Sequence, residues 1–377
     1  MSGRLLALAI AVTGIFSFAF FQFRKQSKEV PKPEITSEPV VSVPQVDTIK
    51  IAGVGDIMMG SDYPNPSGSP NALPPQNGSL LLAQVKDVLS SAHVTFGNLE
   101  GVLIDKGKGT PKGCITLKYC YIFRSPEKFV NNLVDAGFDV MSLANNHASD
   151  FGAEGRKSSM KTLESNGIAH AGFISTPYTT FKRGDLTYGF AAFAPNTGCV
   201  TINDHKYARS IVQHLDSISD IVIISFHGGA EGTAYQHVPR QNEIYIGENR
   251  GNVHQFSHDM IDAGADVVFG HGPHVSRAVE VYNNRFIAYS MGNFCTYASM
   301  SVDGVRGLAP IVTVYTDKKG NFFKAQITPT YQTPLSPVMI DPKNRVIKVI
   351  KELTETDFPE RNFDISDSGL VTLREGQ

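Results

Sequence analysis

The segment Ile49-Lys-Ile-Ala-Gly-Val-Gly-Asp56 joins a short apolar run, typical of a buried strand, directly to a carboxylate. The same order of strand and polar side chain recurs four more times along the chain. A predicted strand at 94–97 is followed by Asn98 and Glu100, and one at 138–143 is followed by Asn145, Asn146 and His147. A predicted strand at 220–226 is followed by His227, and one at 266–270 is followed by His271 and then His274. Because ligand sites in open α/β sheets form outside the carboxyl ends of the strands, we expect these side chains to meet.

The residue types at these strand ends point to a metal. Mixed oxygen and nitrogen donors suit Mn, Fe or Zn better than Ca or Mg, and two close metal ions could clamp a displacement at phosphorus or at a carbonyl. Taken alone, Asp56 or Asn98 could cap a turn, and His227 could be a hydrogen-bonded histidine at a strand end. The five strand ends together favour a divalent metal site. Other histidines, such as His254 and His258, follow no strand end and are predicted to be surface or structural residues.

Helical patterns alternate with the predicted strands, and two predicted hairpins follow at 279–289 and 311–328. This order predicts an α/β sheet core with antiparallel additions. The composition does not change between 49 and 335, so we expect one domain there and a polar C-terminal extension at 336–377. With 34 Lys and Arg against 36 Asp and Glu, the net charge of −2 offers no basic footprint, and nucleic acid is not an expected partner.

The N-terminus carries 19 uncharged residues, Leu5 to Phe23, which as a helix would span a hydrocarbon core of about 30 Å. A cleaved signal peptide is the alternative, but its only candidate cleavage site, Ser17-x-Ala19, lies inside the apolar run. We therefore predict an uncleaved signal anchor at 1–25, forming one transmembrane helix, and a Pro-rich tether at 26–48. The basic residues just after the span favour keeping that side in the cytoplasm.

The cysteines favour the opposite side of the membrane. Cys114 and Cys120 are six residues apart, which suits a small loop disulfide in an oxidising compartment; two ordinary thiols are the alternative. Cys199 and Cys295 are isolated and are predicted to be buried small residues. The pair favours a single-pass membrane protein whose domain is extracytoplasmic, either periplasmic or at the cell surface.

Six motifs, in order, resemble those of the CapA family, which contains bacterial capsule and poly-γ-glutamate biosynthesis accessory proteins. They are Gly55-Asp56-Ile-Met-Met-Gly60, Phe96-Gly-Asn-Leu-Glu-Gly101, Leu143-Ala-Asn-Asn-His-Ala148 with Asp150-Phe-Gly152, Phe226-His-Gly-Gly, Gly270-His-Gly-Pro-His-Val275 with Glu280, and Tyr289-Ser-Met-Gly-Asn-Phe294. The resemblance defines a CapA-like domain at 49–335 and implies a bacterial cell membrane as the location.

The resemblance implies a calcineurin-like metallophosphoesterase fold, which is a two-sheet β-sandwich flanked by helices, with a dinuclear metal site. By position in the motifs it implies metal ligands at Asp56, Glu100, Asn146, His227 and His271, with His274 as a further candidate. It makes His147 the acid that protonates a leaving group, and the spacing suggests that Asp150 orients His147. Asn98, Arg124 and Arg277 are candidates for binding substrate, although both arginines are also compatible with solvated loops.

Two positions depart from the pattern of ordinary superfamily members, which have histidines where this chain has Met58 and Gly272. The site could therefore hold one metal ion, two or none, and three functions stay open. The first is a metal-dependent hydrolase or transferase acting on a phosphoester or an anionic envelope polymer such as poly-γ-glutamate. The second is a non-catalytic, polymer-binding accessory module that works with membrane-embedded capsule synthesis or export proteins. The third is an extracytoplasmic phosphatase unrelated to capsule.

Overall fold

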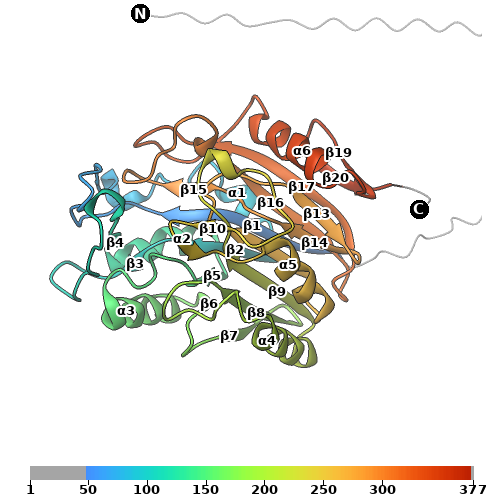
Figure 1. Ribbon diagram of the computed structural model, residues 1–377, viewed down its shortest axis with the longest axis horizontal. Helices are drawn as coiled ribbons and strands as arrows, with labels where there is room; N and C mark the ends of the chain where they lie inside the picture. Colours follow the sequence, from blue (N-terminus) through green and yellow to red (C-terminus); the bar gives the residue numbers. More distant parts are fainter. Residues whose placement is uncertain (1–47, 375–377) are drawn as a thin grey trace, which may run out of the picture. The chain divides into compact units, whose positions relative to one another are not determined.

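The computed structural model describes residues 48–374, which are drawn in colour in Figure 1. The predicted signal anchor at 1–25 lies outside these residues, as does the predicted tether at 26–48 apart from Thr48. Within the described range, no helix has both the length and the apolar character needed to cross a membrane.

Two β-sheets form the centre of the fold (Figure 1). The larger sheet contains, in spatial order, β19 (Phe363–Ile365), β20 (Leu370–Leu373), β17 (Phe322–Tyr331), β16 (Leu308–Thr316), β1 (Ile49–Met58), β2 (Val94–Leu99), β5 (Val140–Ser142) and β6 (Ala169–Ala171). Two more strands join this sheet: β15 (Asn293–Thr296) pairs with β1, and β18 (Met339–Ile340) pairs with β17. The smaller contains β13 (Val279–Tyr282), β14 (Arg285–Ala288), β12 (Val267–His271), β9 (Ile221–His227), β8 (Leu186–Phe193) and β7 (Tyr178–Arg183). Two short ribbons pair β3 (Val102–Leu103) with β4 (Arg124–Ser125) and β10 (Ile244–Tyr245) with β11 (Glu248–Asn249).

Helices cover the outer faces of the sheets. The α-helices are α1 (Lys86–Ser90), α2 (Val130–Ala136), α3 (Gly152–Ser165), α4 (His205–Ile218), α5 (Val253–Asp262) and α6 (Arg345–Asp357). Short 3-10 helices lie at Pro75–Gly78, Leu117–Tyr119, Glu127–Phe129, Thr233–Tyr235 and Gly304–Gly307. The side chains of Asp204 and Asn252 cap α4 and α5 by accepting a hydrogen bond from the backbone N–H three residues on. Each cap uses one of the free N–H groups of the first helical turn.

The strand directions agree with the sequence. The pairs β1–β2, β2–β5 and β5–β6 are parallel, as are β8–β9, β9–β12 and β12–β14. The two predicted hairpins are β13–β14 and β16–β17, both antiparallel. The predicted α/β fold with antiparallel additions is therefore confirmed, and both parallel sets deliver their carboxyl ends for a shared site.

Both faces of the smaller sheet are buried, and β9 illustrates this. Ile221 and Ile223 pack into the core between the two sheets, whereas Val222 and Ile224 pack against α4 and α5. Because successive side chains of a strand point to opposite faces, a strand covered on both sides is apolar at nearly every position. This alternation places His227 on the same face as Ile221 and Ile223, toward the larger sheet.

Aromatic side chains hold the two sheets together beneath the site. Phe96 in β2 stacks on Phe269 in β12, with ring centroids 5.3 Å apart and planes 5° apart. Phe190 in β8 packs against the other side of this pair, 5.5 Å from the Phe96 centroid. Gly53 in β1 provides the space, because a Cβ at that position would lie 2.6 Å from the Phe269 ring.

Within the predicted C-terminal extension, residues 336–374 pack onto the same fold. β20 pairs with β17 and so extends the larger sheet, and α6 packs on β16 and β17. Val346, Ile347 and Ile350 of α6 are buried in the core shared with the sheet. The sequence predicts a weak helix near 345–353, and α6 covers this range with an apolar stripe on an otherwise polar helix.

Gly55→Ala tests how closely β1 must approach the segment before β15. A Cβ at position 55 would lie 2.0 Å from the backbone oxygen of Gly292, and Asp56 N–H donates to that same oxygen at 2.8 Å. Since backbone cannot move aside as a side chain can, we expect a loss of about 3 kcal/mol in the free energy of unfolding, measured by urea denaturation. Gly113→Ala is the control, because a Cβ there meets no atom within 4 Å. Equal midpoints for the two variants would contradict this packing.

Candidate metal centre

The sheet register brings the predicted strand-end residues to one place. In the larger sheet, Asp56 is in register with Asn98 of β2 on one side and with Asn293 of β15 on the other. In the smaller sheet, His227 and His271 are direct neighbours on β9 and β12. These side chains therefore meet, as the sequence predicts, because parallel strands pair in this register.

Asp56 is the centre of a buried network. His271 Nδ1 lies 3.2 Å from its Oδ1, His274 Nδ1 lies 2.8 Å from its Oδ2, and Asn98 Nδ2 donates to Oδ1 at 2.8 Å. Burial would raise the pKa of Asp56, but hydrogen bonds from His271 and His274 outweigh it and hold the pKa below its ordinary range. Burial would lower the pKa of His274, yet its hydrogen bond to Asp56 raises that pKa to about 9.

Glu100 and His227 complete the cluster with Asp56. One potential ligand atom from each of these three buried residues lies within 4.8 Å of the others. Burial, followed by the charge of Asp56, raises the pKa of Glu100 to about 8. Burial also holds the pKa of His227 well below its ordinary value, so its imidazole is neutral at pH 7. Neutral imidazole is the form that binds metal ions.

The residues present fit a divalent metal. Buried polar atoms without a hydrogen-bond partner are concentrated here: Glu100 Oε1, Asn146 Oδ1, both ring nitrogens of His227, and His271 Nε2. Leaving a buried polar atom unpaired costs about 1–3 kcal/mol, and a metal ion bound by these atoms would offset that cost. Carboxylate, amide oxygen and imidazole together suit Mn, Fe or Zn. Asp56, Glu100, His227 and His271, with Asn146 and His274 at the edge, are the residues that would hold it.

Asn98 supports the ligands from within the cluster. Its side chain is fully buried, and Nδ2 donates to both Asp56 Oδ1 and Glu100 Oε2 at 2.8 Å. Its Oδ1 accepts from Asn145 Nδ2 at 3.0 Å. These three hydrogen bonds make Asn98 a support for the carboxylates, and direct contact with substrate stays a prediction.

The backbone explains why Gly272 cannot be a histidine. Gly272 has φ +118°, and a Cβ there would lie 2.6 Å from the backbone oxygen of Gly228. His274, two residues later, has φ +56° and reaches Asp56 from this turn. A left-handed conformation at a non-glycine residue costs of order 1–3 kcal/mol and is typical of functional sites. His274 therefore supplies an imidazole to Asp56 from a different backbone position.

His147 lies beside the cluster in a fixed orientation. Its Nδ1 is 2.8 Å from Asp150 Oδ2, and its ring stacks on Phe123 with centroids 4.1 Å apart. Asp150 is fully buried, accepts from Phe123 N–H at 2.7 Å, and pairs with Lys112 Nζ at 2.5 Å. Burial lowers the pKa of His147, while the Asp150 carboxylate acts to raise it. Since Nδ1 is used by Asp150, Nε2 is the nitrogen left for a bound group.

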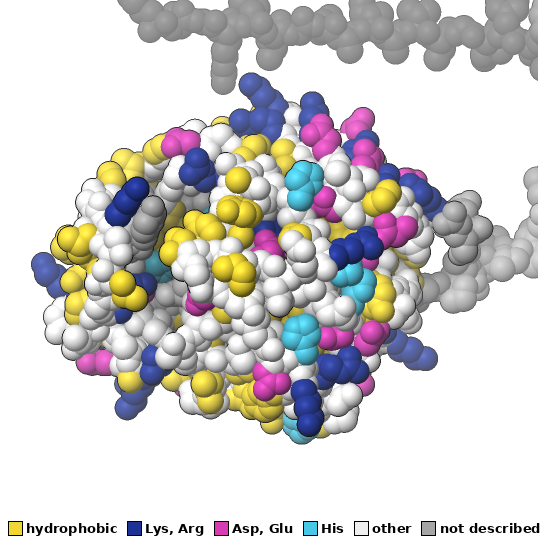
Figure 2. Space-filling view, viewed as in Figure 1, with side chains coloured by type: hydrophobic (Ala, Val, Ile, Leu, Met, Phe, Trp, Pro, Cys, Tyr) yellow, Lys and Arg dark blue, Asp and Glu magenta, His cyan; other side chains and the backbone are white. Residues whose placement is uncertain are grey.

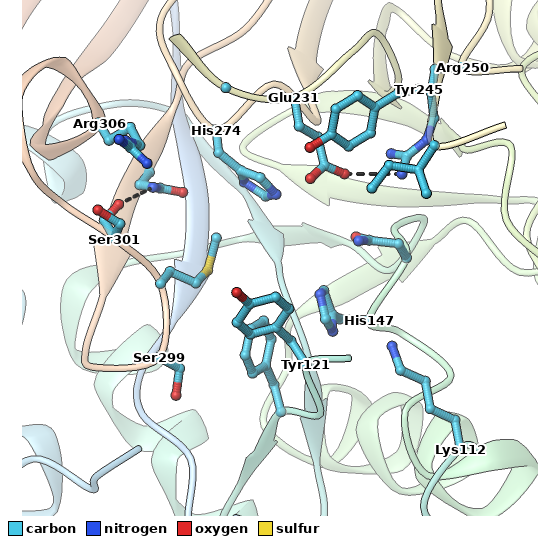
Figure 3. A pocket seen from close by; sticks show the side chains of 16 residues that line it. Lys112, Tyr121, His147, Glu231, Tyr245, Arg250, His274, Ser299, Ser301 and Arg306 are labelled. Atoms are coloured by element: carbon cyan, nitrogen blue, oxygen red, sulfur yellow. Dashed lines mark hydrogen bonds and ion pairs between the residues drawn. The ribbon is translucent and has the colours of Figure 1, made fainter. Parts of the chain in front are cut away.

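A cavity of about 430 Å³ opens next to the cluster (Figure 3). His147, His274, Asn146 and Asn293 connect it to the cluster. Its remaining lining combines polar, aromatic and aliphatic residues: Lys112, Tyr121, Phe123, Glu231, Gly232, Tyr245, Ile246, Arg250, Ser299, Met300, Ser301 and Arg306. Figure 3 shows His147 and His274 facing the same space from opposite sides of the cavity. A group bound here would therefore meet the cluster and His147 together.

Neither arginine predicted to bind substrate lines this cavity. Arg277 is buried; its Nη1 and Nη2 donate to Glu243 at 2.9 and 2.7 Å, and its Nε donates to the Tyr235 carbonyl at 2.8 Å. Arg124 pairs with Asp62, Nε to Oδ1 at 2.6 Å, and lies over the Tyr63 ring. Both arginines therefore have structural partners and lie outside the lining of this cavity, and their predicted role in substrate binding stays a prediction.

The sequence analysis did not identify the arginines that line the cavity, Arg250 and Arg306. Arg250 pairs with Glu231 at 3.0 Å and with Glu248 at 2.5 Å, and the Glu231 pair is marked in Figure 3. Arg306 has a buried Nε without a hydrogen-bond partner among the described residues. Neither follows a predicted strand end. Asn293 could have been identified as a lining residue from the sequence, because its motif, Tyr289 to Phe294, also places a polar residue beside apolar ones.

A disulfide joins Cys114 and Cys120, whose Cα atoms are 5.7 Å apart. Cys120 is buried with Ile122 and Phe151 in a small apolar cluster, and Cys114 packs against it. Tyr121 and Phe123, which line the cavity, follow directly in the chain. The cross-link thus secures the start of the segment that carries the ring against which His147 stacks. Cys199 and Cys295 are buried free thiols.

The fold and the site define an α/β-sandwich protein with a candidate metal centre that opens into a polar cavity. The chain belongs to the family described as bacterial capsule synthesis protein PGA_cap, which matches residues 50–298. The family resemblance found in the motifs is confirmed, and the matched residues include the whole cluster from Asp56 to His274.

Relatives and solved structures resemble the chain to different extents. PGA biosynthesis protein CapA of Bacillus subtilis (strain 168) is 26% identical over 368 residues, covering 92% of this chain and 86% of the relative. Capsule biosynthesis protein CapA of Bacillus anthracis is 27% identical over 264 residues, covering 64% of this chain and 58% of that protein. A phosphatase structure from Mycoplasma pneumoniae aligns with a TM-score of 0.46 and 14% identity, over 80% of this chain and 97% of the other.

His271→Ala tests whether the cluster binds metal. We expect purified protein reconstituted with Mn, Fe or Zn to lose metal in His271→Ala, since the variant removes a buried ligand, and to keep it in His147→Ala. The measurement is metal per chain by elemental analysis after gel filtration, with folding checked by circular dichroism. A folded His271→Ala protein that holds as much metal as the wild type would contradict the assignment.

Proposed function

We propose that this chain is a membrane-anchored, extracytoplasmic protein of bacterial capsule or poly-γ-glutamate synthesis or export. We further propose that its cavity hydrolyses or transfers a phosphoester or an anionic envelope polymer with one or two divalent metal ions. The pathway is supported by family membership and by the two relatives whose names state capsule or PGA biosynthesis. Membrane-embedded synthesis or export proteins are the partners that such a role requires.

The observation that carries the catalytic part is the His147–Asp150 pair at the cavity. A protein that only binds a metal needs ligands alone, whereas an imidazole oriented by a buried carboxylate is suited to general acid–base catalysis. Asp150 holds Nδ1 of His147 at 2.8 Å, and Phe123 stacks on the ring, so Nε2 has one orientation toward the cavity. This arrangement favours an enzyme over a passive module.

The roles of the residues follow from their positions. A bound divalent ion would lower the pKa of a water molecule and offset the negative charge of a phosphoryl or carbonyl group. Asn98 holds the Asp56 and Glu100 carboxylates in place through its two hydrogen bonds. His147 takes up a proton at Nε2 from the attacking water and passes it to the leaving oxygen or nitrogen. Arg306, with its unpaired Nε, neutralises an anionic substrate in the cavity.

A non-catalytic accessory module is the second candidate, and two residues favour it. Met58 is buried at a position where ordinary superfamily members have a ligand histidine, and Gly272 occupies another such position. Met58 Sδ accepts a hydrogen bond from Gly60 N–H at 3.3 Å, so this sulfur already has a partner within the chain. Under this alternative the cavity binds polymer without turning it over.

His147→Ala separates the two candidates. If the cavity is catalytic, we expect turnover of phosphoesters or poly-γ-glutamate to fall about 10²–10⁴-fold, because general acid–base catalysis is lost while metal is retained. Asp150→Asn should give a smaller loss, since the imidazole stays but its orientation weakens. His214→Ala, in an exposed position on α4, is the matched control. Wild-type protein with full metal content and no turnover, but with saturable polymer binding, would favour the accessory module.

The disulfide gives a test of location that does not depend on activity. An extracytoplasmic domain should have Cys114 and Cys120 oxidised in cells, whereas thiols in the cytosol are kept reduced. Acid-quenched cells, denatured without reductant and treated with a maleimide reagent, should show labelling of Cys199 and Cys295 only. Labelling of all four cysteines would contradict the proposed location. A Cys114→Ser/Cys120→Ser variant provides the two-thiol reference.

A further inference from the structure

A second group of potential ligands lies on α5 and β13, away from the strand ends that form the first centre. His254 and His258 are four residues apart on α5, so their side chains occupy the same face of the helix. Glu280 on β13 faces them, and one potential ligand atom from each of the three residues lies within 4.8 Å of the others. The described part of the chain contains no other such group besides the one at Asp56.

The geometry is close to that of an open zinc site. Zinc–ligand distances of about 2.0–2.1 Å in a tetrahedron place neighbouring ligand atoms about 3.4 Å apart. His258 Nε2 lies 3.0 Å from Glu280 Oε2, within reach of that spacing after a small adjustment. The side chains of His258 and Glu280 are 17% and 13% exposed, so an ion could enter from solvent and still be largely enclosed. Figure 2 shows histidine side chains at the surface over the region where Figure 1 places α5 and β13.

The surrounding residues already hold the group in place. Tyr289 Oη donates to Glu280 Oε2 at 2.6 Å, which is the kind of support that outer residues give to a ligating carboxylate. His258 stacks on Tyr282 with centroids 3.7 Å apart, and the His254 ring is nearly parallel to that of Tyr289. The neighbouring cation, Arg240, pairs with Glu360 and lies over Phe358. Glu280 is thus oriented toward the histidines.

We propose that His254, His258 and Glu280 form a second divalent-metal site, of the zinc class, with three protein ligands and one open position. Two imidazoles and a carboxylate are a ligand set used for Zn²⁺, and a strong N/O site prefers Zn²⁺, Cu²⁺ or Ni²⁺ to Mg²⁺ or Ca²⁺. The ion ties α5 to β13, the edge strand of the smaller sheet. This proposal stands independently of whether the cavity is catalytic.

The test is metal binding by the full-length protein, stripped of metal and titrated with Zn²⁺ or with Co²⁺ as a spectroscopic probe. We expect His258→Gln and Glu280→Gln each to lose one equivalent, or to bind it at least tenfold more weakly, and to lose the corresponding Co²⁺ visible band. His271→Ala, which affects only the first centre, should keep that band. His214→Gln is the matched control on α4. Unchanged stoichiometry and affinity in both His258→Gln and Glu280→Gln would overturn the proposal.

A second measurement needs no variant. Diethyl pyrocarbonate modifies accessible histidines, and peptide mass spectrometry reports each site. In wild-type protein, Zn²⁺ should protect His254 and His258 at least tenfold while leaving modification of exposed His214 unchanged. Equal modification of His254 and His258 with and without Zn²⁺ would overturn the proposal, even if the variants fail to fold.

Discussion

A carboxylate that no water reaches must be stabilised by its neighbours, and Asp56 is such a group. Removing a carboxylate from water costs several kcal/mol even after the protein relaxes around it. The compensation comes from His271, the last residue of β12 in the smaller sheet, from His274 just after it, and from Asn98 in the larger sheet. The pairing of the two sheets and the burial of this charge are therefore one constraint, because each depends on the other.

The close approach of the sheets is what makes that constraint possible. Phe96 and Phe269 stack across the interface directly below the cluster, and the Phe96 ring also lies 5.5 Å from the His271 ring. Gly53 and Gly55 in β1 leave space for Phe269 and for the backbone of Gly292. An apolar layer thus ends where the polar cluster begins. Such a boundary excludes water from the ligands on one side and leaves the cavity open on the other.

The sequence was sufficient for the elements that depend on local pattern. Apolar runs located the parallel strands, and the residues directly after them proved to be the buried cluster, because parallel pairing forces strand ends to one edge. Long-range partners were not accessible in this way. The sequence does not show that Arg277 pairs with Glu243, 34 residues away in the chain, or that Arg306 lines the cavity. His254 and His258 carried a four-residue spacing, but their third member, Glu280, comes from another element.

The energetic cost of the cluster argues that it binds something. Unpaired buried atoms on Glu100, Asn146, His227 and His271 each cost about 1–3 kcal/mol, and His274 adds the cost of a left-handed backbone. Apolar residues of similar size would remove these costs, since buried charge pairs can often be replaced without loss of stability. A module that only bound polymer at its surface would gain nothing from keeping them. A divalent cation bound at these atoms, as proposed above, would offset the cost of leaving them unpaired.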